Sequence, residues 1–199
     1  MSYRPVLLAC ALLLGCDSGP SVGLGRFHVV ATRGANTCGA QALALQATVE
    51  FDVELKVGEG TIRWTPSGAD SATGSWSASL RAFRVMQESD IVAWAADRRT
   101  GRAGCTIRRA DVVEGSVTFD DADASVASDA SAQGDGGAAP VARSFTATET
   151  IVYGATPGSD CAAAVGAGDG QFNAMPCNVT YTLTARRTGD NSATPAITF

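Results

Sequence analysis

Long apolar runs, lysine and histidine are the clearest shortages in this chain of 199 residues. No apolar run reaches the roughly 18 residues that a membrane-spanning helix needs, so the sequence predicts no such helix. Lys56 is the only lysine and His28 the only histidine, whereas arginine occurs 14 times. The net charge is −5 and the pI is about 4.8. This acidic balance argues against nucleic acid as a partner.

Large apolar side chains are scarce as well. Val, Ile, Leu and Phe together number 40, while alanine alone contributes 35 residues. A fraction near one fifth lies close to the limit at which folding becomes difficult, but the modest net charge argues against global disorder. We therefore expect one domain with a core that is small for the length of the chain.

The first 16 residues carry the most specific signal of the sequence. Arg4 is the only charge in residues 1–5, and residues 6–14 form an apolar stretch with the length of a signal-peptide core. The stretch runs into Leu13-Leu14-Gly15-Cys16. This motif resembles the bacterial lipobox, in which a small residue precedes an invariant cysteine. The resemblance implies cleavage before Cys16, a diacylglycerol on its sulfur and a fatty acid such as palmitate on the new amino group.

The lipobox resemblance also predicts where the protein resides. Residues 1–15 would be the signal peptide, and residues 16–25 the lipidated N-terminus and a flexible tether. Two or more acyl chains hold a protein stably on a membrane. We therefore expect a protein of the bacterial cell envelope, anchored to the outer membrane or to the periplasmic face of the inner membrane. The alternative is an ordinary cleaved signal in which the cysteine occurs by chance.

Four cysteines remain after Cys10 is removed with the signal peptide and Cys16 is lipidated. An even number in an exported domain indicates disulfide bonds, with three arithmetically allowed pairings. We favour a local Cys161–Cys177 bond and a long-range Cys38–Cys105 bond. A zinc site would favour close C-x-x-C pairs, which the chain lacks. We therefore expect no metal and no cofactor.

Alternating apolar and polar residues predict antiparallel strands that are half buried. The clearest run is residues 49–57, where Val, Phe and Leu alternate with charged side chains. Further strands are predicted at residues 26–32, 61–65, 75–87, 91–96, 104–109, 112–119, 145–153 and 179–186. Only residues 38–46 have a helical composition. About eight or nine short strands indicate a single all-β domain, a sandwich or a barrel, over residues 26–188.

Turn signals separate these predicted strands. Gly58-Glu59-Gly60 suits a hairpin, and turns are also predicted at Glu88-Ser89-Asp90 and Thr100-Gly101-Arg102. Residues 120–142 contain five aspartates, no basic residue and almost no large apolar side chain. We expect them to form a disordered acidic loop inserted between two strands. Residues 189–199 are expected to form a frayed tail.

Catalytic signatures are missing from the sequence. It contains no G-x-S-x-G, no H-E-x-x-H and no P-loop. His28 lies in a predicted strand, where we expect an ordinary surface histidine. Glu50 and Glu54 share the solvent face of an amphipathic strand. We therefore expect that the protein is not an enzyme.

Two groups of residues are candidates for binding. Five arginines surround a predicted hairpin turn, and their planar guanidinium groups suit phosphate or carboxylate ligands, such as an acidic polysaccharide or lipid headgroups. They are Arg98, Arg99, Arg102, Arg108 and Arg109. The second group is Trp64, which we assign to the core, and Trp76 and Trp94, which we assign to core or rim packing.

Three functions remain open from these features. The first is a structural or interaction role in the envelope, with an envelope protein or polysaccharide as partner and the membrane bound through the N-terminal lipid. The second is a carrier that holds an apolar ligand inside a barrel, similar to bacterial lipocalins, although the lipocalin G-x-W signature is missing near the first strand. The third is an enzyme. A cavity above roughly 300 Å³ with apolar walls would favour the carrier, and a filled interior the interaction role.

Overall fold

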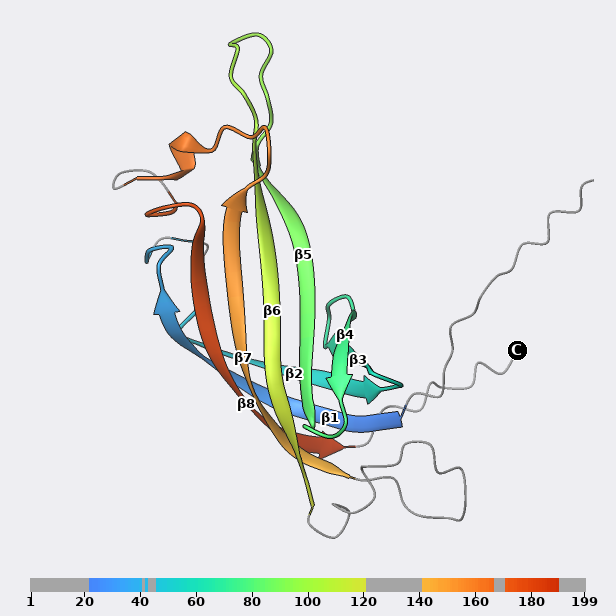
Figure 1. Ribbon diagram of the computed structural model, residues 1–199. Coiled ribbons are helices and arrows are strands. Elements are labelled where there is room, and N and C mark those ends of the chain that lie inside the picture. Colours follow the sequence, from blue (N-terminus) through green and yellow to red (C-terminus); the bar gives the residue numbers. More distant parts are fainter. Residues whose placement is uncertain (1–21, 41, 43–45, 121–140, 167–170, 190–199) are drawn as a thin grey trace, which may run out of the picture.

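The protein is a closed antiparallel barrel of eight strands (Figure 1). The computed structural model describes residues 22–40, 42, 46–120, 141–166 and 171–189. Successive strands are neighbours, and β8 pairs with β1 to close the barrel. The all-β prediction is confirmed, and a barrel is formed rather than a sandwich. The strands are β1 (Val22–Asn36), β2 (Thr48–Val57), β3 (Thr61–Pro66), β4 (Ala72–Ser77), β5 (Ala82–Trp94), β6 (Cys105–Phe119), β7 (Ala142–Ala155) and β8 (Cys177–Gly189).

The period-two pattern of residues 49–57 correctly predicts β2. Val53 and Leu55 are buried, and Phe51 packs against the same core from a partly buried position. The predicted hairpin at Gly58-Glu59-Gly60 is also confirmed, since it joins β2 to β3 and Gly60 has a φ of 66°. Strand β1 begins at Val22, so residues 22–25 belong to the barrel rather than to the expected tether.

The turn predicted at Glu88-Ser89-Asp90 is wrong, because these residues continue β5. Asp90 lies opposite Arg108 on β6, and its Oδ1 accepts a hydrogen bond from Arg108 Nε at 3.0 Å. Polar residues that suggest a turn are here outward-facing partners in a strand pair. The two predicted strands at residues 104–109 and 112–119 also form a single strand, β6, which runs through Ala110 and Asp111.

Four cysteines form two disulfide bonds, as expected, but the favoured pairing is wrong. Cys38 bonds to Cys177, and Cys105 bonds to Cys161. Cys161 lies on the long connection between β7 and β8, whereas Cys38 follows the end of β1 and Cys177 begins the neighbouring strand β8. Barrel closure therefore brings together cysteines that are 139 residues apart.

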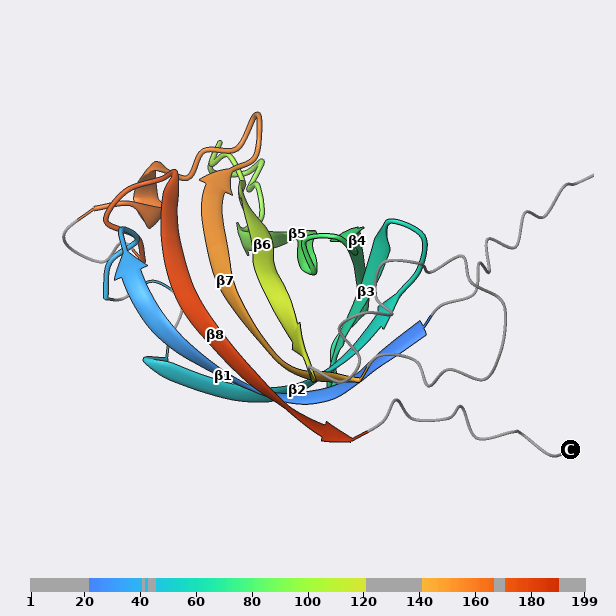
Figure 2. The ribbon, with the colours of Figure 1, turned by 60° about the horizontal axis from the view of Figure 1, so that its bottom comes forward.

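The connection between β7 and β8 covers one end of the barrel (Figures 1 and 2). We call its described part, residues 156–166 and 171–176, the cap loop. Thr156 N–H and Asp160 N–H donate to the carbonyl oxygens of Thr106 and Gly104, at 2.9 and 3.0 Å. Phe172 is fully buried, and its ring centroid lies 5.5 Å from that of Tyr153. Together with the Cys105–Cys161 disulfide, these contacts hold the cap loop on the barrel.

Aromatic side chains fill the other end of the barrel and form a floor. Phe145 contacts Phe27, Trp64 and Phe83, with ring centroids 5.3, 5.7 and 5.8 Å apart. All four residues are at most 6% exposed. Strands β5, β6 and β7 rise beyond the short β3 and β4 (Figure 1). The barrel is therefore closed and packed below, and its wall is incomplete above β3 and β4.

Several predictions fall outside the described residues. They are the signal peptide and Cys16, most of the acidic insertion (residues 121–140) and the tail from residue 190. Within residues 38–46 the described positions adopt no helix. No helix in the described part of the chain is long and apolar enough to cross a membrane.

Candidate functional site

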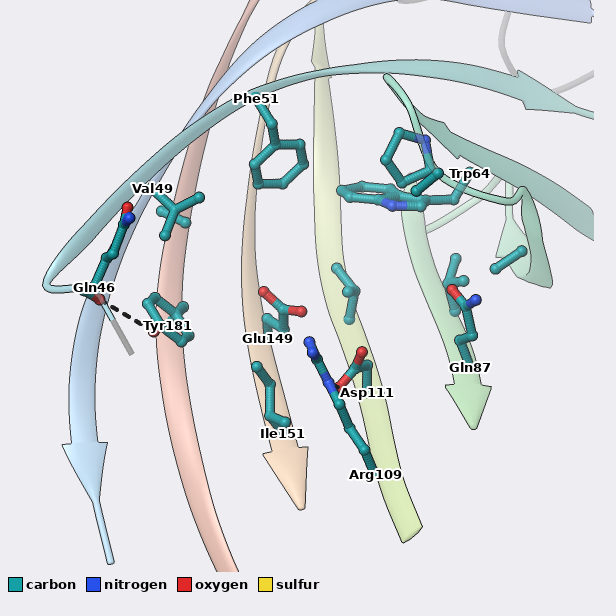
Figure 3. A pocket seen from close by; sticks show the side chains of 16 residues that line it. Gln46, Val49, Phe51, Trp64, Gln87, Arg109, Asp111, Glu149, Ile151 and Tyr181 are labelled. Carbon is teal, nitrogen blue, oxygen red and sulfur yellow. Dashed lines mark hydrogen bonds and ion pairs between the residues drawn. The ribbon is translucent and has the colours of Figure 1, made fainter. Parts of the chain in front are cut away.

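An open cavity lies inside the barrel, next to Trp64 of the aromatic floor (Figure 3). Its volume is about 550 Å³, and small-molecule sites typically have about 300–1,000 Å³. Every strand contributes at least one lining residue. The exposed residues Ala69 and Gln87 line its mouth, next to the incomplete part of the wall.

Apolar and aromatic side chains form most of the cavity wall. Phe51 and Trp64 lie side by side at one end, with ring centroids 6.4 Å apart and ring planes inclined by 63° (Figure 3). Trp64 also belongs to the floor, so its ring separates the cavity from the packed core. The remaining apolar lining comes from Ala31, Val49, Pro66, Ala72, Val85, Val113 and Ile151.

Three charged side chains interrupt this apolar wall at neighbouring inward positions. Arg109 and Asp111 lie on β6, and Arg109 Nε donates to Asp111 Oδ1 at 2.8 Å. Glu149 lies on β7, opposite Val113. Glu149 is therefore diagonal to Asp111 across the strand pair. All three point into the cavity in Figure 3. We call them the charged triad.

The pKa values of the charged triad follow from burial and mutual charge. Burial, assisted by the negative charge of Asp111, raises the pKa of Glu149 to about 7. Burial disfavours the Arg109 cation, but the hydrogen bond and charge of Asp111 outweigh this and hold its pKa above the usual value. Near neutral pH, Glu149 therefore exchanges its proton while Arg109 stays charged.

Two tyrosines adjoin the charged triad. Tyr181 on β8 lies opposite Glu149, and its hydroxyl donates to the backbone oxygen of Gln46 at 3.1 Å. Burial raises the pKa of Tyr181, and it likewise raises the pKa of Tyr153. Both phenols are therefore neutral at pH 7. The Tyr181 hydrogen bond fixes the segment that carries Gln46 at the rim of the cavity.

A second cavity of about 410 Å³ lies beneath the cap loop. Ile91 and Trp94 of β5, Ile107 of β6 and Phe172 of the cap loop contribute to its lining. No charged side chain lines it among the described residues. Nothing there selects one ligand over another, so we consider the first cavity the candidate site. The described part of the chain also holds no cluster of three potential metal ligands.

The five arginines predicted as one anion site are divided by the barrel wall. Arg98 and Arg99 are exposed in the loop between β5 and β6, where Arg102 lies 4.6 Å from the centroid of the Trp94 ring. Arg108 points outward and pairs with Asp90 at 3.0 Å. Arg109 points into the cavity. Strand alternation separates Arg108 from Arg109, so the five do not converge.

Other candidate residues lie where ordinary packing would place them. Trp64 is buried, as predicted, and Trp76 packs against the core from a partly buried position. The indole N–H of Trp94 donates to the Ala103 carbonyl at 3.1 Å. His28 is a surface residue whose Nδ1 lies 3.0 Å from Asp52 Oδ1.

Asp111 and Glu149 were not predicted as site residues. Glu149 belongs to the alternating run 145–153, on the same face as Phe145, Ile151 and Tyr153. A carboxylate on a core-facing position costs free energy unless it has a partner or a function. The charge of Glu149 on a core-facing position was therefore the one feature of the sequence that could have indicated the site. Asp111 gave no such signal, because the predicted break between residues 109 and 112 removed it from any strand.

Comparison of the chain with protein-family models, curated proteins and solved structures found no match. The candidate site therefore rests on the geometry of this barrel alone.

Proposed function

We propose that this protein is a lipid-anchored barrel of the bacterial cell envelope that binds a small, mainly apolar molecule in its interior cavity. The observation that carries the proposal is the cavity of about 550 Å³. A barrel that served only as a scaffold would gain stability by filling this space, because each unfilled methyl-sized volume costs about 1 kcal/mol. Here the floor is packed, and the space above it is lined by apolar rings.

The composition of the lining supports a binding site. Small-molecule sites combine mostly apolar walls with a few polar groups that orient the ligand. The Phe51 and Trp64 rings supply the apolar wall, and the charged triad supplies the polar groups. This arrangement favours a carrier over a purely structural role in the envelope.

Two further features support the proposed location. The two disulfide bonds are typical of an oxidising compartment outside the cytoplasm. The lipobox-like sequence that ends at Cys16 is typical of an envelope lipoprotein. In this arrangement the lipid holds the barrel at a membrane while the cavity stays open to the surrounding water.

Binding of a neutral apolar dye tests the proposal. N-phenyl-1-naphthylamine should bind with a rise in fluorescence and a single saturable phase. Gln87→Trp places a large ring at the mouth of the cavity and should weaken binding at least about tenfold. Met86→Trp is the matched control, because Met86 is the preceding residue on β5 and its side chain is 54% exposed on the outer face. Absence of saturable binding, or equal binding by both variants, would contradict the proposal.

A further inference from the structure

The charges inside the cavity do not cancel. Arg109 pairs with Asp111 at 2.8 Å, so these two charges neutralise each other. The carboxylate of Glu149 has no such counter-charge. Glu149 makes no hydrogen bond or ion pair with another described side chain within 4.0 Å. Asp111 accepts the Arg109 N–H through Oδ1. When Glu149 is ionised, the cavity carries one net negative charge.

We infer that the cavity selects an amphipathic cation, with an ammonium group at Glu149 and an apolar body against Phe51 and Trp64. This inference rests on the proposed function. Glu149 can accept hydrogen bonds from the ammonium group, and Asp111, diagonal to Glu149 across the β6–β7 pair, adds a second negative charge nearby. A hydrogen bond between two charged groups is also stronger than one between neutral groups. The aromatic faces of Phe51 and Trp64 attract a nearby cation as well.

An anionic ligand fits this arrangement less well. The Arg109 guanidinium is the only cation that lines the cavity among the described residues, and Asp111 already neutralises it. A ligand carboxylate would meet two carboxyl groups and would require at least one of them to bind a proton. A neutral ligand would gain the apolar contacts but would leave an ionised Glu149 without a partner in a poorly solvated position.

Protonation of Glu149 couples affinity to pH. The groups that face Glu149 are Arg109 and Asp111 on β6, Tyr153 on its own strand and Tyr181 on β8, and Arg33 on β1 acts on Tyr181. A cation binds the ionised form of Glu149, whose pKa is about 7. Affinity for the cation should therefore rise about tenfold between pH 6 and pH 8, because the ionised fraction rises by about that factor. A carboxylate ligand would show the opposite trend.

The experiment compares three ligands that share one ring system. They are 1-naphthylmethylamine, 1-naphthylmethanol and 1-naphthoate, titrated calorimetrically into the folded protein at pH 6, 7 and 8. At pH 8 the amine should bind at least about tenfold more tightly than the alcohol, and 1-naphthoate should bind most weakly. Glu149→Gln should remove most of the advantage of the amine over the alcohol and flatten its pH dependence. Glu114→Gln is the matched control, since Glu114 lies on the outer face of β6 and is 61% exposed.

The outcomes separate the two proposals. If the alcohol binds but the amine has no advantage, or if 1-naphthoate binds most tightly, the cation inference is wrong and the ligand-binding proposal stands. If the amine keeps its advantage in Glu149→Gln, the assignment to Glu149 is wrong. If none of the three binds, the proposed function itself is contradicted. Should Glu149→Gln fail to fold, the pH dependence of the unmodified protein still decides, because a flat profile overturns the inference.

Discussion

Glu149 introduces a pH dependence into the stability of the empty barrel. Its pKa is about 7 in the folded protein, against a reference value of 4.5. Between these values the folded state holds a proton that the unfolded state has released. The free energy of unfolding should therefore fall as pH rises from about 4.5 to 7 and change little above that.

We predict that the barrel is more stable at pH 5 than at pH 8, by about 1–2 kcal/mol from Glu149. The full pKa difference corresponds to about 3 kcal/mol, and solvent access through the open mouth reduces this amount. Urea unfolding at both pH values measures it. Glu149→Gln should remove the difference, and Glu114→Gln should retain it. A barrel that is more stable at pH 8 would contradict the placement of Glu149.

Gly115 makes room for the aromatic floor. It lies opposite Phe83 on β5, and a Cβ at this position would stand 2.9 Å from Phe83 Cζ and 2.5 Å from the Thr146 carbonyl oxygen. Both distances are shorter than real Cβ contacts. A side chain at this position would therefore force the backbone or the Phe83 ring to shift.

We predict that Gly115→Ala destabilises the protein by about 1–3 kcal/mol, because the crowded backbone and ring must shift. Gly154→Ala is the control, since a Cβ there meets only Pro176 Cβ at 3.9 Å. Thermal unfolding of the two variants tests the difference. Equal melting temperatures of the two variants would show that the aromatic floor can accommodate a Cβ at residue 115.

At the scale of elements, the strands with strict alternation were the predictable part. Residues 49–57 have charged residues on one face and Val, Phe and Leu on the other, and this pattern alone identifies β2. Strand β6 was predicted as two strands on either side of Ala110 and Asp111, and β5 was predicted in pieces because Glu88 and Asp90 resemble turn residues. Their ion pairs with Arg108 stabilise them in the strand instead, at 3.9 and 3.0 Å. The local sequence around Glu88 and Asp90 does not reveal which residue lies opposite them on the neighbouring strand.

The two disulfides stabilise different elements. Cys38–Cys177 joins the ends of β1 and β8, where the barrel closes, and Cys105–Cys161 attaches the cap loop to β6. Loop entropy gives about 5 kcal/mol for the 139-residue separation and about 4 kcal/mol for the 56-residue separation.

We predict that Cys38→Ala/Cys177→Ala lowers the melting temperature of the whole barrel more than Cys105→Ala/Cys161→Ala does. The second double variant should mainly accelerate amide hydrogen exchange in the cap loop. Mass spectrometry with peptide resolution measures the exchange, and peptide mapping without reductant checks the pairing. Uniformly faster exchange across all strands in the second variant would show that the cap loop is not a separate unit.

For the whole molecule, the sequence predicted the fold class and disulfide content but little of the site. Arg109 was singled out, yet with four arginines that lie outside the barrel or in a loop. Asp111 and Glu149 meet only because β6 and β7 pair in one particular register. The cavity itself depends on the short β3 and β4 beside longer neighbours, and relative strand lengths in a closed barrel do not follow from local composition.

The proposed lipid anchor concerns the whole molecule, and a substitution at Cys16 tests it. We predict that Cys16→Ser abolishes lipid attachment and releases the protein from membranes, because no other acylation site is expected. Detergent partitioning of envelope fractions measures this, with metabolic labelling by a fatty acid as a second readout. Ser18→Ala is a nearby control, and this variant should stay in the detergent phase. Equal retention of the Cys16→Ser protein would contradict the lipoprotein proposal.

The pairing of the first and last strands gives the barrel a mechanical character. Arg26 and Gly189 are partners at one end of the β1–β8 seam, and the Cys38–Cys177 bond lies beyond the Asn36–Val179 pair at the other. Tension applied between residues 22 and 189 loads the hydrogen bonds between β1 and β8 one pair at a time, beginning at the Arg26–Gly189 end. The opening stops at the disulfide, so the oxidised barrel can lengthen only by a fixed amount. After reduction the separation continues to the end of both strands, and the closed barrel becomes an open sheet without an interior cavity.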